Sequence, residues 1–68
     1  MMGAKGKWKK IETLVFALKE QGFSFQILRL DKQYRLIIYR DEYQLCDVIL
    51  QSLSDIIEVL RLAYSLTR

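Results

Sequence analysis

The chain has no histidine, no proline and a single cysteine, Cys46. Without histidine it lacks the side chain most often used for proton transfer near neutral pH and for binding transition metals. A lone cysteine permits no intramolecular disulfide and cannot form a thiolate zinc site by itself. These absences argue against an enzyme, a metal site or a bound cofactor, and they favour a reducing compartment such as the cytoplasm.

Few other groups in the sequence could act in catalysis. Asp41, Glu42 and Asp47 lie close together and could serve as paired carboxylates. Acidic residues beside a turn are usually turn and solvation residues. Cys46 has no histidine base, so we interpret it as a small core side chain. We therefore assign no catalytic residue and expect no small-molecule substrate.

The length of 68 residues predicts a single small domain covering residues 1–68. The hydrophobic fraction of 51% is high for a chain whose interior is so small. Some apolar surface is therefore expected to meet another chain. No apolar run is long enough to span a bilayer, and the N-terminal pattern does not indicate a signal peptide, so we expect no contact with a membrane.

Positive charge is concentrated at the N-terminus, in Lys5, Lys7, Lys9 and Lys10. The remainder carries 7 basic and 8 acidic side chains, so the excess of +3 resides in the first ten residues. Residues 1–6 contain two glycines and no apolar period, which predicts a mobile basic lead. Such an end can meet nucleic acid or anionic lipid, but it is often a plain solvated terminus.

Residues 7–21 predict an amphipathic helix. Apolar side chains recur there at three- and four-residue steps, which is the spacing of one helical face: Trp8, Ile11, Leu14, Val15 and Leu18. Gly22 can end this helix in the left-handed conformation, and Phe23 follows where a contact back to the last turn is usual.

Residues 23–40 predict an antiparallel hairpin across the polar link Asp31–Gln33. Alternation assigns one face to the core, with Phe23, Phe25 and Ile27 on the first strand and Tyr34, Leu36 and Ile38 on the second. The other face also carries apolar side chains, namely Leu28, Ile37 and Tyr39. These three residues either decorate the solvent face or contact a partner.

Residues 43–49 fit two structures. As a third strand they would turn Cys46 and Val48 to the core; alternatively, a longer second helix could begin near Asp47. The residue types favour the strand, and Ser52 to Asp55 resembles a capping box before the next helical run. In that arrangement Ser52 accepts from first-turn amides and Asp55 faces the positive end of the helix dipole.

The second helix is predicted from about Leu53 to Leu66. One apolar stripe should pack on the sheet, formed by Leu53, Ile56, Ile57, Leu60 and Tyr64. A second stripe, Val59, Leu62 and Leu66, lies off that face and predicts that the helix takes part in an interface.

The predicted fold class is α+β, in the order αβββα, with two helices on one face of a three-stranded antiparallel sheet; αββα is the alternative. The αβββα order resembles the double-stranded-RNA-binding domain and the small mRNA-interferase toxins that share its layout. The RNA-binding domains grip phosphates with a basic cluster at the start of their second helix, where this chain has Ser52, Ser54 and Asp55. The toxins rely on a histidine, which is absent here. The resemblance is therefore one of topology, and we assign no family.

Two functional hypotheses follow. The first is a non-catalytic protein-interaction module of the regulator, adaptor or inhibitor type, which forms a homodimer and binds an unidentified protein. Its expected interface residues are Leu28, Ile37, Tyr39, Val59, Leu62 and Leu66.

The second hypothesis is a nucleic-acid-binding domain that uses Lys5, Lys7, Trp8, Lys9 and Lys10, joined by Arg35 and Arg40. The two hypotheses give Trp8 different roles. In the first it begins the core stripe, which its spacing to Ile11 and Val15 favours, and in the second it is an exposed base-stacking group.

Overall fold

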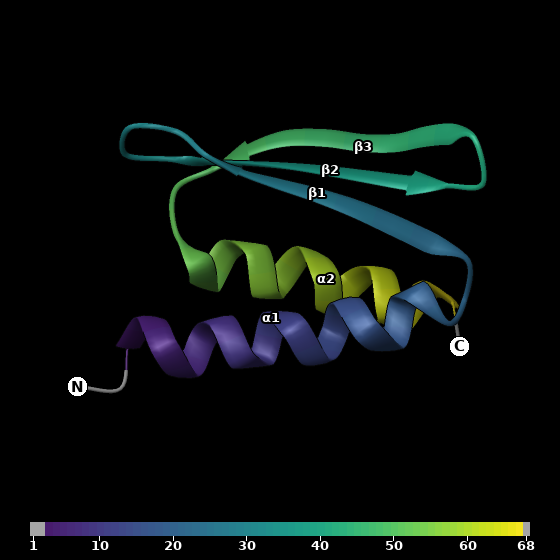
Figure 1. The fold of residues 1–68 in the computed structure, drawn as a ribbon, viewed down its shortest axis with the longest axis horizontal. Coiled ribbons are helices and arrows are strands. Elements are labelled where there is room, and N and C mark those ends of the chain that lie inside the picture. Colours follow the sequence, from purple (N-terminus) through teal and green to yellow (C-terminus); the bar gives the residue numbers. More distant parts are fainter. Residues whose placement is uncertain (1–2, 68) are drawn as a thin grey trace.

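The computed structural model describes residues 3–67 and contains two helices and three strands (Figure 1). In chain order they are α1 (Gly3–Lys19), β1 (Phe23–Arg29), β2 (Tyr34–Arg40), β3 (Tyr43–Leu50) and α2 (Leu53–Thr67). The strands form one antiparallel sheet in the order β1-β2-β3. Both helices lie on the same face of the sheet and run in the same direction (Figure 1). The predicted α+β fold in the order αβββα is confirmed.

Residues 43–50 form a strand, so the alternative with a longer second helix is wrong. In the register of β2 and β3, Leu36 lies opposite Val48 and Ile38 opposite Cys46. The register shifts between Ile38 and Tyr39, and Tyr39 pairs with Gln44. This bulge leaves Leu45 without a direct partner on β2.

The predicted start of the first helix is wrong. Helix α1 begins at Gly3 rather than at Lys7, and it therefore includes residues 3–6 of the predicted mobile lead. Met1 and Met2 lie outside the described residues. The helix ends at Lys19, two residues before the predicted end at Gln21. Gly22 then adopts a φ of 95°, and its N–H donates to the Lys19 carbonyl at 3.0 Å, as expected for a glycine that closes a helix.

The start of α2 follows the predicted capping pattern. The Asp55 N–H donates to the Ser52 hydroxyl oxygen at 3.3 Å, so Ser52 satisfies one amide of the first turn. Asp55 places its carboxylate in that turn, where the helix dipole is positive. The hairpin link is also as predicted, with the Leu30 N–H donating to the Gln33 carbonyl at 2.9 Å.

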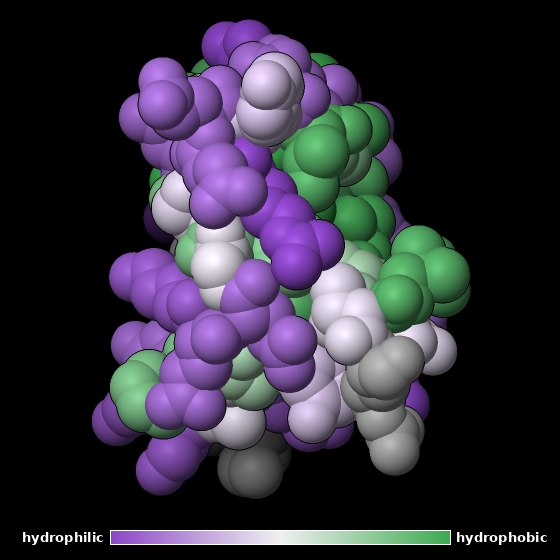
Figure 2. Space-filling view, turned by 90° about the vertical axis from the view of Figure 1, so that its right-hand side faces the viewer, coloured by the Kyte–Doolittle hydropathy of each residue, from purple (hydrophilic) through white to green (hydrophobic). Residues whose placement is uncertain are grey.

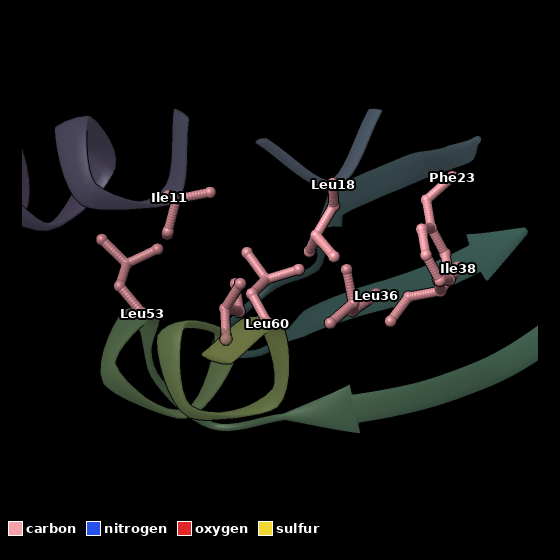
Figure 3. Packing of buried hydrophobic residues seen from close by; sticks show 8 residues of the cluster. Ile11, Leu18, Phe23, Leu36, Ile38, Leu53 and Leu60 are labelled. Atoms are coloured by element: carbon pink, nitrogen blue, oxygen red, sulfur yellow. The ribbon is translucent and has the colours of Figure 1, made fainter. Parts of the chain in front are cut away.

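The core lies between the sheet and the two helices (Figure 3). It is formed by residues from every element except β3: Ile11 and Leu18 from α1, Phe23 from β1, Leu36 and Ile38 from β2, and Leu53, Ile56 and Leu60 from α2. Cys46 and Val48 of β3 pack against this cluster, as predicted. Burying each such aliphatic side chain contributes about 1.5–3 kcal/mol, so this layer holds the helices on the sheet.

Candidate interaction surfaces

An apolar hollow of about 420 Å³ lies between the edge strand β3 and the C-terminal half of α2. We call it the β3–α2 surface, and its main residues are Ile38, Leu45, Cys46, Val59, Leu62 and Leu66. Three leucines stand out from it, since Leu45 is 57%, Leu62 63% and Leu66 85% exposed. Figure 2, which views the molecule from the right-hand side of Figure 1, shows hydrophobic side chains gathered along one flank. Apolar side chains from β2, β3 and α2 therefore converge on one solvent-facing surface.

The position of β3 explains why this surface is open. Strand β2 is central and β3 is at the edge, so one side of β3 has no neighbouring strand among residues 3–67. The bulge leaves Leu45 unpaired beside the hollow, and α2 carries the Val59, Leu62 and Leu66 stripe along the other wall. Sequence reasoning found the stripe on α2 but missed Leu45. The sequence of β3 gives no clear signal for the bulge, because its position depends on the pairing with β2.

Arg40 and Phe23 form the border of the β3–α2 surface. Both residues line the hollow, and the Arg40 guanidinium carbon lies 5.1 Å from the centre of the Phe23 ring. This is the geometry of a cation–π contact. The surface therefore has an apolar centre and an arginine at its border, which is the arrangement found in protein–protein interfaces.

The opposite face of the sheet carries the other predicted interface residues, Leu28, Ile37 and Tyr39. Ile37 is only 5% exposed, so it offers little surface to a partner. Its cross-strand neighbours are Gln26 and Asp47. The structure therefore splits the predicted interface between two faces of the molecule and does not bring its six residues together.

An ion pair crosses this face beside Ile37. The Arg35 Nε donates to Asp47 Oδ1 at 2.9 Å, and Nη2 donates to Oδ2 at 2.6 Å. The hydrogen bonds from the guanidinium, helped by its charge, lower the pKa of the Asp47 carboxyl, and partial desolvation opposes them. The same pairing raises the pKa of Arg35. Both partners remain accessible to water, so the pair orients side chains and contributes little to stability.

Trp8 and the two lysines that follow it lie on different sides of α1. Lys9 and Lys10 line a hollow of about 560 Å³ between the two helices, and Trp8 is not among its lining residues. Trp8 instead meets Tyr34, with ring centres 6.4 Å apart and planes at 76°. It is 38% exposed and lies outside the core cluster. Trp8 is thus neither a core residue nor a free stacking group beside the lysines.

The two strand arginines of the nucleic-acid hypothesis have intramolecular contacts. Arg35 pairs with Asp47, and Arg40 lies over Phe23. Lys7 lines a hollow of about 320 Å³ together with Arg29 of β1 and Lys32 of the hairpin link. The structure therefore places hairpin cations beside Lys7, which the sequence did not indicate.

The described part of the chain, residues 3–67, offers neither a metal site nor a membrane span. No cluster of three or more His, Cys, Asp or Glu side chains in that range could hold a metal ion. Within the same range, neither helix is long and apolar enough to cross a membrane.

No protein-family model, no curated protein and no solved structure matches the chain. The fold class, α+β, is therefore all that the structure assigns, and the likeness to the double-stranded-RNA-binding domain is limited to the order of the elements.

Proposed function

We propose that the protein is a non-catalytic interaction module that forms a homodimer through the β3–α2 surface. The observation that carries this proposal is the exposure of Leu45, Leu62 and Leu66 around one apolar hollow. Exposed apolar patches of this kind mark protein-binding sites on small soluble domains. We place the module in the cytoplasm, where its free thiol, Cys46, stays reduced.

A second copy of the chain suits this surface for two reasons. An isologous contact around a two-fold axis uses the same patch on both subunits, so one apolar surface covers the other. A chain of 68 residues also has a small core, and association is a common source of the additional stability. In this proposal, binding of a further regulated protein would compete with the second copy.

Charge insertion tests the proposal. Leu62→Glu places a carboxylate within the β3–α2 surface and should weaken self-association at least about tenfold, because the contact would desolvate a charge among apolar side chains. Sedimentation equilibrium across protein concentration measures the effect. Phe16→Glu is the matched control, since Phe16 on α1 is 68% exposed, close to the 63% of Leu62, and lies outside the surface. Equal weakening by both variants, or a parent that stays monomeric at high micromolar concentration, contradicts the proposal.

A second candidate function is nucleic-acid binding, supported by the gathering of Lys7, Arg29 and Lys32 around one hollow. Phosphate contacts of this kind weaken steeply as salt rises. A titration of labelled duplex and single strands at two salt concentrations tests it, and absence of binding at low salt removes it.

A further inference from the structure

The two helices border a shallow, open groove on the side of α2 that faces α1, away from the β3–α2 surface. Two hollows of about 560 and 420 Å³ adjoin there and share Gly6, Lys10, Ile57 and Arg61. We call this the α1–α2 groove. Leu14 and Ile57 are half-buried and form its apolar floor, together with Gly6, which adds no side chain.

The border of the α1–α2 groove is strongly basic. Lys7, Lys9 and Lys10 stand on α1 and Arg61 stands on α2, whereas Glu58 is the one acidic residue that lines either hollow. Within residues 3–67 the only ion pair joins Arg35 to Asp47, so none of these four cations has a carboxylate partner there. The groove therefore has an apolar floor between unpaired positive charges.

The lysines at the border have no acidic neighbours at the start of α1, since the first turn of this helix contains no acidic residue. Lys7, Lys9 and Lys10 therefore repel one another across a short stretch of helix. An anionic partner would relieve this repulsion on binding.

We infer that the α1–α2 groove binds an acidic amphipathic helix of a partner protein. The apolar face of that helix would cover Leu14 and Ile57, and its carboxylates would meet the basic border. A third helix packs naturally between two neighbouring helices, and helix-in-groove binding uses apolar anchors at such spacings. The floor extends from Gly6 to Leu14, about two helical turns, so the bound segment needs about ten to fifteen residues.

Charge and shape favour this occupant over the other anionic ligands. A phosphate backbone presents no apolar surface for Leu14 and Ile57, and the base-stacking candidate Trp8 does not line the groove. A bilayer surface cannot enter a hollow between two helices, since membrane-binding helices present a protruding apolar face. The inference does not depend on self-association, because Leu45, Leu62 and Leu66 line neither hollow.

The probe for this inference is a labelled helical peptide of about fifteen residues with leucine at one helical face and glutamate elsewhere. Its binding is measured by fluorescence anisotropy against a shuffled peptide of the same composition. We expect the patterned peptide to bind at least about tenfold more tightly, because only it can cover the floor and reach the border together. Equal affinity for the two peptides overturns the inference.

Two variants place the binding in the groove. Lys10→Glu should lower the affinity for the patterned peptide at least about tenfold. Lys19→Glu makes the same charge change outside the groove and should have little effect on that affinity. Gly6→Leu should also weaken binding without loss of stability, because a Cβ at Gly6 meets nothing within 4 Å and the added side chain enters the hollow.

The remaining outcomes overturn the inference. Equal losses from Lys10→Glu and Lys19→Glu would mean nonspecific attraction. Failure of the patterned peptide to bind would remove the acidic helix as the occupant. In that case, binding of labelled duplex RNA or of vesicles containing anionic lipid, abolished by Lys10→Glu, would assign the border to those ligands instead.

Discussion

Trp8 shows how one side chain can belong partly to the core and partly to the surface. Its ring edge meets Tyr34 on β2, yet 38% of the residue is exposed. Helical spacing predicted that Trp8 faces the sheet, which its contact with Tyr34 bears out, but it did not predict how much of the ring stays exposed. Ile11, one turn later, is 2% exposed and carries the packing that the spacing predicted for both residues.

Trp8→Ala should therefore lower the free energy of unfolding by about 1–2 kcal/mol, the scale of an aromatic pair and partial burial. Ile11→Ala is the comparison and should cost about 2–5 kcal/mol, as for a fully buried aliphatic residue. Urea unfolding of both variants measures the difference. A Trp8 loss as large as that of Ile11 would place the ring in the core, and no loss would make it a free surface group.

Ile37 and Leu45 mark what a residue pattern cannot show. Alternation assigned Ile37 to the outer face of the sheet, which is correct, but Arg35, Asp47 and the adjacent side chains leave it only 5% exposed. Leu45, to which the sequence pattern gave no role, has no direct partner on β2 because the bulge shifts the register of β3. Both outcomes depend on neighbours from other strands, so the sequence of one strand does not contain them.

At the scale of elements, β1, β2 and α2 could be predicted closely because apolar periodicity and end signals agree there. Gly22 ends α1 and Ser52 begins α2, each through a hydrogen bond of the expected kind. The start of α1 could not be predicted, because residues 3–6 have no apolar period and contain two of the glycines. Helix formation there follows from continuation of a packed helix, in which each added residue requires no new nucleus.

The glycines of α1 and its C-terminal turn test this account of the helix. Gly6→Ala should stabilise the protein by about 0.5–1 kcal/mol, since alanine favours the helix and the new Cβ meets no atom. Gly22→Ala should destabilise it by about 1 kcal/mol or more, because its φ of 95° disfavours a side chain. Thermal unfolding of the two variants gives opposite shifts if α1 extends through Gly6. No stabilisation by Gly6→Ala would mean that the helix starts later in solution.

The strand at Tyr43–Leu50 was the segment that two patterns fitted. Helical steps through Cys46, Ile49 and Leu53 were present, but pairing with β2 covers the core with Cys46 and Val48 and leaves Ser52 free to cap α2. A helix that began near Asp47 would have lost the pairing of Cys46 and Val48 with β2 and the Ser52 cap of α2. The choice between strand and helix at residues 43–50 therefore depends on pairing with the central strand β2, which the sequence of this segment alone does not show.

At the scale of the whole molecule, the sequence predicted a surplus of apolar surface but not its place. The stripe of Val59, Leu62 and Leu66 was visible as a helical pattern, and its meeting with Leu45 required the sheet order and the bulge. The separation of Trp8 from Lys9 and Lys10 likewise required the packing of α1 on the sheet. The molecule thus presents an apolar flank at β3 and α2 and a basic groove between its helices.

Cys46 offers the most direct test of the central claim, that self-association covers the β3–α2 surface. It is the only cysteine of the chain, it is half-buried, and it lines the hollow. The measurement is the rate of thiol alkylation per molecule as protein concentration rises through the association range found by sedimentation. The account predicts that the rate falls in proportion to the dimeric fraction and that Leu62→Glu keeps the fast rate at those concentrations. A rate independent of concentration while the parent protein dimerises would contradict it, because the contact would then lie on another face.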